Sequence, residues 1–184
     1  NLVAGLDAPS AGTVTAQGRV ALMFQEAALL PWRTAAQNVE LALKLRRVPR
    51  AERRAQALEL LSLVRLQDFA DKRPHELSGG MRQRVALARA LGQGADVLLM
   101  DEPFGALDAI TRDVLHDEVE RVAAEQQLTT IFVTHNVREA ARLGDSIVLL
   151  SSRPGRVAAE FGVPVERPRR IESPEVSAIA AYVT

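Results

Sequence analysis

Two adjacent carboxylates, Asp101 and Glu102, directly follow the short apolar run VLLM at residues 97–100. Such an uninterrupted run predicts a buried strand, and open α/β sheets bind ligands at the carboxyl ends of their strands. At that place Asp101 could hold Mg²⁺, which prefers oxygen ligands and keeps part of its hydration shell. Glu102 could polarise a water molecule for attack on a phosphate. The alternative is that the Asp-Glu-Pro sequence only ends a strand.

Two adjacent glycines, Gly79 and Gly80, follow Ser78 in the motif LSGGMRQR at residues 77–84. The sequence after them predicts a helix over residues 79–91. Glycines allow backbone N–H groups to approach a phosphate closely, and the dipole of a helix adds positive potential at its N-terminus. The segment therefore predicts either an anion site or only a helix whose first turn is capped by Ser78.

The elements that must position these residues alternate between strands and helices in the second half of the chain. Runs at 97–100, 129–133 and 146–150 predict buried parallel strands, separated by helices at 109–126 and 137–143. Such alternation is typical of a parallel sheet covered by helices, so the predicted fold class is α/β. The remaining predicted elements are the end of a helix at 1–6, strands at 13–16, 19–24 and 158–163, helices at 34–46 and 49–66, and a last helix that begins at Ser173.

These elements predict one domain with an insertion. Residues 1–33 and 95–163 form the α/β core, and residues 34–94 form an inserted helical lobe. Residues 164–184 form a basic, proline-containing linker and part of a helix. In the lobe, the predicted helix 49–66 has arginines on one face and apolar side chains on the other. The apolar face is formed by Ala55, Leu58, Leu61 and Val64.

Composition and charge narrow the possible functions. The 184 residues are 47% hydrophobic and 25% charged, which is typical of a globular domain with its own core. The formal net charge is zero, so no global field favours nucleic acid as a partner. Cysteine is absent, which excludes disulfides and cysteine metal sites. The longest apolar run, 178–183, is far shorter than the ~20 residues that cross a bilayer, so a role at a membrane requires a partner that spans it.

The order and spacing of four segments resemble the ATP-binding subunits of ABC transporters. They are LSGGMRQR at 77–84, the alanine-rich stretch that follows it, VLLMDEP at 97–103 and ALD at 106–108. The resemblance covers essentially the whole chain and implies a P-loop NTPase fold. It also implies ATP and Mg²⁺ as ligands, and ATP hydrolysis coupled to transport.

The resemblance assigns catalytic roles to Glu102, His135 and Gln25. Glu102 would activate the water that attacks the γ-phosphate, and His135 would contact that phosphate. Gln25 would join Asp101 at the metal, sense the attacking water and relay that state to a membrane partner. Members of the family commonly carry Asp where this chain has Asn136, which changes the electrostatic surroundings of His135.

A histidine at the end of a strand is also common as a structural residue, and this alternative applies to His135. It is the preferred interpretation for the other two histidines, His75 and His116.

The glycine motif has a second implied role, across a dimer. Ser78, Gly79, Gly80 and Gln83 would contact the nucleotide of the opposite subunit. This implies a head-to-tail homodimer, or a pair with another ATPase subunit, with two composite sites. Asp108 resembles the loop that communicates across that dimer, but it could equally be only the N-cap of the helix that follows it.

The apolar cluster LLPW at residues 29–32 comes directly after Gln25 and is the candidate surface for docking a transmembrane permease subunit. The alternative is that these side chains belong to the core. With VALARA at 85–90 and SRPGR at 152–156, the cluster resembles ATPases of the nitrate, sulfonate and taurine importers. This branch implies a peripheral protein at the cytoplasmic face of the inner membrane, served indirectly by a solute-binding protein, with no nucleic acid partner.

The phosphate-binding loop of this family, which ends in Gly-Lys-Ser/Thr, is absent from the sequence. The only lysines are Lys44 and Lys72, and neither follows a glycine or precedes Ser or Thr. We therefore expect a chain that is truncated before this Walker A loop and that lacks the strands of that segment, with open sheet edges and no ATP in its own site. Alternatives are a non-catalytic interaction protein and an ABC ATPase without a transport role, such as one for DNA repair or translation.

Overall fold

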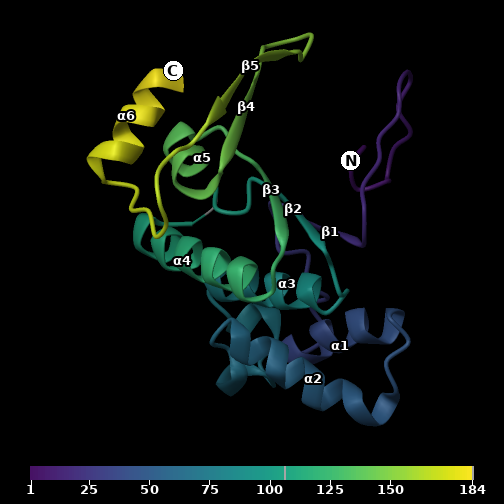
Figure 1. The fold of residues 1–184 in the computed structure, drawn as a ribbon. Helices are drawn as coiled ribbons and strands as arrows, with labels where there is room; N and C mark the ends of the chain where they lie inside the picture. The colour runs from purple at the N-terminus through teal and green to yellow at the C-terminus, as the bar shows by residue number, and fades with distance from the viewer. Residues whose placement is uncertain (106, 184) are drawn as a thin grey trace. The chain divides into compact units, whose positions relative to one another are not determined.

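The computed structural model describes every residue of the chain except Ala106 and Thr184. The first residue of the predicted ALD segment and the last residue of the predicted C-terminal helix therefore lie outside the described residues. The chain divides into two compact units, Asn1–Ile131 and Phe132–Thr184. Figure 1 shows the elements of both units, and each unit is described by itself.

The sheet of the first unit contains the predicted buried strand. Strand β2 (Val97–Asp101) pairs in parallel with β1 (Val20–Met23), and Met23 lies opposite Met100. Strand β3 (Thr129–Val133), in which the division between the units falls, completes the order β1-β2-β3. This arrangement confirms the predicted α/β class with a parallel sheet. Because β1 and β2 end in register, the residues that follow both strands leave the sheet at the same edge.

Three helices of the first unit pack on one another: α1 (Ala35–Leu45), α2 (Arg50–Leu63) and α3 (Gly79–Leu91). Two short 3₁₀ helices, Gln67–Phe69 and Pro74–Glu76, connect α2 to α3. A fourth helix, α4 (Ala109–Glu125), follows β2 and contacts α3. Between residues 34 and 94 the structure is helical, as was predicted for the inserted lobe. The division of the chain into core and lobe stays a prediction.

The start of α1 illustrates how the sequence defines these helices locally. Thr34 and Gln37 form a capping box, in which each side chain accepts a hydrogen bond from the backbone N–H of the other, at 3.2 and 3.1 Å. These bonds satisfy two donors that a helix N-terminus otherwise leaves open. The small residues Ala35 and Ala36 are fully buried, so this first turn lies close against its neighbours.

The buried face of α2 differs from the prediction. Ala57, Leu61 and Val64 are fully buried, whereas Ala55 is exposed and Leu58 is half-buried. The observed spacing of four and then three residues keeps side chains on one face of a helix. Ala55 lies two positions from Ala57, which is about 200° around the helix, so it points to the opposite side.

The first 16 residues contain neither of the two predicted elements. Residues 1–6 form exposed turns instead of the end of a helix, with Gly5 N–H donating to the Leu2 carbonyl at 3.1 Å. Residues 13–16 are exposed and, in the part of the chain that the structure describes, form no strand. A single turn without tertiary packing does not offset the cost of helix nucleation, and a strand requires a partner strand.

The second unit contains a two-stranded sheet, which corrects the prediction for residues 146–150. Strand β4 (Ser146–Leu150) pairs antiparallel with β5 (Val157–Gly162), rather than joining a parallel sheet. Helices α5 (Val137–Leu143) and α6 (Pro174–Val183) pack on each other. The core of the unit gathers apolar side chains from all of these elements and from the segment between β5 and α6. Its buried members are Ala141, Ile147, Val163, Val176 and Val183.

Two strands that were predicted to be buried expose part of their apolar side chains. In β3, Ile131 and Val133 are 42% and 56% exposed, and in β4, Val148 and Leu150 are 53% and 63% exposed. Among the described residues, each of these strands lies at the edge of its sheet, with a single hydrogen-bonded neighbour. An edge strand is covered less than a central one, so apolar runs alone overestimated the burial of both strands.

The predicted linker at 166–171 is fixed to the rest of the second unit. The Arg169 guanidinium is almost fully buried and donates to the Gly144 and Val165 carbonyls at 2.6 and 2.7 Å. Arg167 donates to the Leu143 carbonyl at 2.6 Å and to the Asp145 carboxylate. Two arginines therefore satisfy carbonyls at and just beyond the C-terminus of α5, where positive charge is favourable.

Candidate functional site

The segment that follows β2 makes a sharp turn. Asp101 is exposed at the end of the strand, and Glu102 is half-buried, with a backbone φ of +42°. Few residues other than glycine adopt this left-handed conformation, which costs about 1–3 kcal/mol where the surroundings enforce it. Phe104 supplies such an anchor, because it is 1% exposed and its ring contacts the fully buried ring of His116 edge-on, at 4.3 Å between centroids. His116 is therefore a structural residue, as interpreted from the sequence.

Gln25 and Glu102 converge at Gly105. A Cβ atom placed on Gly105 would lie 3.6 Å from Nε2 of Gln25 and 3.7 Å from Oε2 of Glu102. Two side chains that were predicted to share a catalytic site therefore approach the same point beside Gly105, a residue without a side chain. Gly105 itself was missed by the sequence analysis, although its position directly after the anchor Phe104 could have indicated it.

Helix α3 holds the loop that carries Gln25. The amide nitrogen of Gln83 donates to the Gln25 carbonyl at 2.6 Å. The guanidinium of Arg89 donates to the Ala28 and Ala27 carbonyls at 2.7 and 2.8 Å. Burial lowers the pKa of Arg89, and the bonds to the loop compensate part of the cost of that burial. The backbone position of Gln25 is thus set by the helix that begins with the glycine motif.

These contacts give Gln83 and Arg89 structural roles that were not expected from the sequence. Gln83 was predicted to contact nucleotide, and the structure places it in a buried position against the backbone of Gln25; its role towards nucleotide stays a prediction. Arg89 was missed. A basic residue inside the alanine-rich, otherwise apolar stretch 85–90 was the signal that could have identified it.

The glycine motif begins α3, with Ser78 as the N-cap. The Ser78 hydroxyl accepts a hydrogen bond from Met81 N–H at 3.3 Å. Ser78 is exposed and Gly79 is half-buried, whereas Gly80 is buried. A Cβ on Gly80 would lie only 2.3 Å from Cγ2 of Thr111 in α4, but a Cβ on Gly79 would meet its nearest neighbour at an ordinary 3.5 Å. Gly80 is thus required by packing within the chain, and Gly79 is not.

Asp108 caps α4 and also fixes Thr111. Its carboxylate accepts from the N–H and the hydroxyl of Thr111 at 3.0 and 2.7 Å. The hydroxyl and then the backbone N–H of Thr111 hold the pKa of Asp108 below its ordinary value. The capping role expected from the sequence is therefore confirmed, and the role across a dimer stays a prediction.

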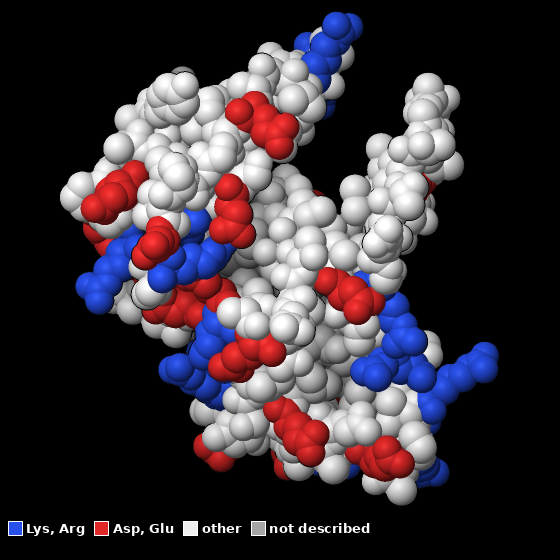
Figure 2. Space-filling model, in the orientation of Figure 1, with Lys and Arg blue, Asp and Glu red and all other residues white. Residues whose placement is uncertain are grey.

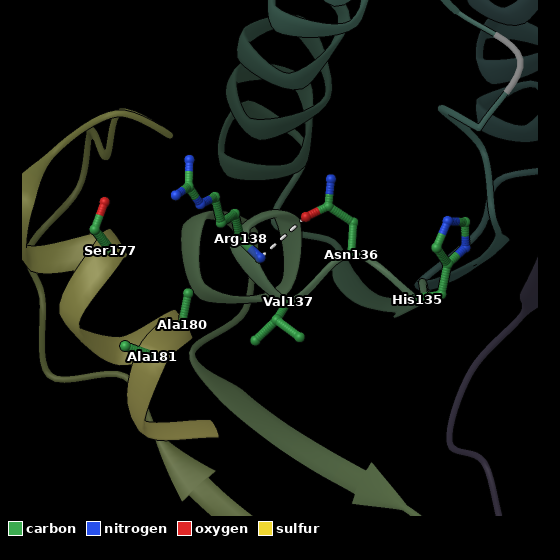
Figure 3. A pocket seen from close by; sticks show the side chains of 7 residues that line it. All are labelled: His135, Asn136, Val137, Arg138, Ser177, Ala180 and Ala181. Carbon is green, nitrogen blue, oxygen red and sulfur yellow. Dashed lines mark hydrogen bonds between the residues drawn. The ribbon is translucent and has the colours of Figure 1, made fainter. Parts of the chain in front are cut away.

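In the second unit, His135 lies at the entrance to α5. It is exposed, and Asn136 caps the helix by accepting from Arg138 N–H at 3.1 Å and Glu139 N–H at 3.4 Å. Figure 3 shows the bond to Arg138 as a dashed line. An asparagine caps a helix about as well as an aspartate, so Asn136 keeps this turn without adding a charge beside His135.

A pocket of about 630 Å³ opens beside this turn. His135 lies at the opposite end of the pocket from Ser177 and Ala181 of α6 (Figure 3). The other side chains that line it are Asn136, Val137, Arg138 and Ala180.

The apolar cluster at 29–32 lies in the loop after Gln25. Trp32 is 67% exposed, whereas Leu29 and Leu30 are half-buried, so the core interpretation is wrong for Trp32. The fully buried Asn38 of α1 fixes the loop, because its side-chain oxygen accepts from Leu30 N–H at 2.8 Å and its nitrogen donates to the Leu30 and Thr34 carbonyls. A rigid loop therefore presents an exposed tryptophan.

The donor set at the carboxyl edge of the sheet fits Mg²⁺. Asp101 is the last residue of β2, and Gln25 lies two residues after β1, which pairs in register with β2. Both residues offer oxygen atoms, the ligands that Mg²⁺ prefers. Among the described residues, no cluster of three or more His, Cys, Asp or Glu could enclose a metal ion. Mg²⁺ does not require such a cage, because it retains several waters and takes its remaining ligands from bound phosphates.

Among the described residues, every helix is too short or too polar to cross a bilayer.

Comparison with known proteins identifies relatives across the chain. The profile of the ABC transporter family matches residues 1–105. The chain is 45% identical over 175 residues to the taurine import ATP-binding protein TauB of Rhizobium johnstonii, covering 91% of this chain and 67% of that protein. It is 44% identical over 188 residues to the aliphatic sulfonates import ATP-binding protein SsuB 1 of Mesorhizobium japonicum, covering 99% and 70%.

An uncharacterized ABC transporter ATP-binding protein of Methanocaldococcus jannaschii is 42% identical over 176 residues, which cover 91% of this chain and 66% of that protein. The chain thus spans about two thirds of the length of these relatives.

A solved structure has the same fold. The ATP-binding cassette MJ0796, in a dimeric post-hydrolysis state bound to ADP and Pi, superposes with a TM-score of 0.68 at 36% identity, covering 80% of this chain and 64% of that one. The family profile, the relatives and the fold together show that the chain belongs to the ABC transporter family, as an ATP-binding domain.

Proposed function

We propose that this chain is the catalytic part of an ATP-hydrolysing subunit that drives import of a small anion such as nitrate, a sulfonate or taurine. The observation that carries the proposal is the convergence of Gln25 and Glu102 around Gly105, at the edge where Asp101 leaves the sheet. Relatives that are named for taurine and sulfonate import support the class of solute.

The chemistry follows from the positions of these side chains. Glu102 acts as the general base and accepts a proton at a carboxylate oxygen from the water that attacks the γ-phosphate of ATP. The amide of Gln25, which approaches the same point beside Gly105, orients that water. Asp101 and Gln25 hold Mg²⁺, which neutralises charge on the phosphates when it is bound. The left-handed backbone of Glu102, anchored through Phe104, keeps the carboxylate at this edge.

The second half of the site faces a partner subunit. Ser78, Gly79, Gly80 and Gln83, with Asp108, complete the nucleotide site of the opposite subunit in a head-to-tail dimer. The exposure of Ser78 supports a close approach of a phosphate at this point, and packing within the chain does not require a glycine at Gly79. Dimeric structures of a related cassette support the pairing.

His135 contacts the γ-phosphate in this proposal. Its exposure, and its position directly before the N-terminus of α5, leave the ring accessible to a ligand. The rigid loop that presents Trp32 receives the permease subunit, which places the protein at the cytoplasmic face of the membrane. A solute-binding protein outside the membrane acts on the same transporter only through the permease.

The test uses a chimaera in which a segment that contains a phosphate-binding loop ending in Gly-Lys-Ser/Thr is joined before Asn1. We expect Glu102→Gln to lower the ATP turnover of this chimaera by about 10²–10⁴-fold, which is the contribution of a general base. ATP binding persists, because the amide keeps the shape of the side chain and removes a negative charge near phosphate. The control is Glu59→Gln, which changes an exposed carboxylate of α2. Turnover close to that of the control would exclude Glu102 as the base.

A further inference from the structure

The turn between α1 and α2 concentrates positive charge in a chain whose net charge is zero. Residues 44–54, with the sequence KLRRVPRAERR, contain six basic residues and one carboxylate, Glu52. We call this segment the basic turn. Basic side chains gather over the α1 and α2 end of the first unit in Figure 2. The excess of five positive charges is confined to this segment, so an anionic partner would bind at the basic turn and not over the whole surface.

Three of the six basic side chains form ion pairs or hydrogen bonds within the first unit. Arg54 pairs with Glu40 at 3.7 Å and with Asp71 at 2.8 Å. Arg53 donates to the Val48 carbonyl at 2.8 Å, and Arg46 donates to the Gly92 carbonyl at 3.5 Å.

The other half have no such contacts. Lys44, Arg47 and Arg50 are exposed and make no side-chain hydrogen bond or ion pair in the part of the chain that the structure describes. Three cations of the basic turn are therefore available to a ligand.

Helix stability explains only part of this charge. Lys44 lies in the last turn of α1, where a cation interacts favourably with the helix dipole. Arg50 and Arg53, however, lie in the first turn of α2, where positive charge is unfavourable, and Glu52 is the only acid there. The arginines at the start of α2 therefore reduce the stability of that helix, and a contact outside the chain accounts for them better than folding does.

An exposed leucine lies among these cations. Leu45 is 76% exposed, between the basic residues Lys44 and Arg46. A surface that combines an accessible apolar side chain with several cations fits an anionic bilayer, because the cations meet the headgroups while the apolar group enters the interface. The basic turn contains no aromatic residue on which a base could stack, which disfavours single-stranded nucleic acid.

We propose that the basic turn binds the anionic lipid headgroups of the membrane surface, through Lys44, Arg47 and Arg50, with Leu45 inserted between them. The placement of the protein near a bilayer rests on the proposed function, whereas the charge and the exposed leucine do not. This contact adds a direct lipid attachment to the attachment through the permease. It also orients the α1 and α2 pair towards the membrane.

The experiment measures co-sedimentation of the 184-residue chain with phosphatidylcholine vesicles, with and without phosphatidylglycerol. We expect binding only to vesicles that contain phosphatidylglycerol, and weaker binding as salt is added. Each basic residue near an anionic surface changes partitioning about fivefold, so replacement of Lys44, Arg47 and Arg50 by Gln lowers it about 10²-fold. Leu45→Gln keeps every charge and lowers partitioning about tenfold, as partial burial of a leucine predicts.

The matched control replaces Arg153, Arg156 and Arg170 by Gln, which removes three exposed cations elsewhere in the chain. We expect this control to bind like the parent. Equal losses in the two triple variants would overturn the proposal, because net charge alone would then explain binding. An unchanged Leu45→Gln variant would also overturn it, because no side chain would then enter the bilayer.

Competition with duplex DNA and with transfer RNA, at matched phosphate concentration, addresses the other class of polyanion. Release of the protein from the vesicles would assign the surface to nucleic acid and overturn the lipid proposal. Circular dichroism melts check that each variant is folded. The assay contains no ATP, so its outcome is independent of the Glu102 test, and either proposal can fail alone.

Discussion

Gly79 and Gly80 stand next to each other at the start of α3, but they meet different neighbours. A side chain on Gly80 would overlap Thr111, whose hydroxyl is bound to Asp108 and cannot turn away without losing that bond. A side chain on Gly79 would make only ordinary contact with Leu107. Gly80 therefore permits the close approach of α3 to α4, whereas packing within the chain does not require a glycine at Gly79.

This difference predicts opposite results for two substitutions. In the 184-residue chain, Gly80→Ala should lower the free energy of unfolding by about 1–3 kcal/mol, as overpacking does, whereas Gly79→Asp should change it little. In the chimaera, Gly79→Asp should abolish ATP-dependent dimerisation, because it places bulk and negative charge where a phosphate of the partner subunit must lie. Thermal melts and light scattering measure the two effects. If Gly79→Asp dimerises as well as its parent, the proposal that Gly79 contacts the nucleotide of the opposite subunit is wrong.

At the scale of elements, side chains of α3 hold the backbone of the loop after β1 in place. The side chain of Gln83 donates to the Gln25 carbonyl of that loop, and the side chain of Arg89 donates to the Ala27 and Ala28 carbonyls. The same helix begins at the motif that is proposed to face the partner subunit. A movement of α3 on dimerisation would therefore shift the backbone that carries Gln25.

We expect Arg89→Ala to lower the free energy of unfolding by about 1–3 kcal/mol, because it removes a charged donor from two carbonyls. In the chimaera the same change should lower kcat more than it raises KM, since it displaces Gln25 without touching the binding of ATP. The control on the same helix is Arg84→Ala, because the described residues give Arg84 no side-chain hydrogen bond or ion pair. Identical melts and identical kcat for the two variants would contradict the role of Arg89.

At the scale of the whole molecule, different residues hold the loop at 29–32 in place and offer a surface to a partner. Asn38 fixes the backbone of this loop from below, through buried hydrogen bonds, while Trp32 remains exposed. A side chain that is exposed in the free subunit and held by a rigid loop is suited to fill a pocket or groove of a partner.

Trp32→Ala should therefore change the free energy of unfolding by no more than about 0.5 kcal/mol, as is usual for surface substitutions. In the chimaera it should weaken co-purification with the membrane subunits of a taurine importer, while ATP hydrolysis in detergent changes little. Tyr182→Ala is the control, because it removes another exposed aromatic side chain, from α6. A folded Trp32→Ala variant that co-purifies as well as this control would exclude the docking surface.

The sequence by itself determined the features that depend on neighbours along the chain. The motif residues Ser78 and Asp108 cap helices because a short polar side chain directly before a helix reaches its first N–H groups. The bounds of α3 and β3 were predicted as observed, because helical periodicity and apolar runs are local patterns. The family followed from the order of these same motifs.

Only the tertiary structure decided which distant residues meet and which apolar residues stay exposed. Gln83 and Arg89 reach carbonyls 58 to 62 positions away in the sequence, and no local pattern specifies such partners. The same holds for the antiparallel pairing of β4 with β5 and for the exposure of Trp32. An apolar side chain has the same local pattern whether or not another segment covers it, because burial depends on which segments the fold packs against it.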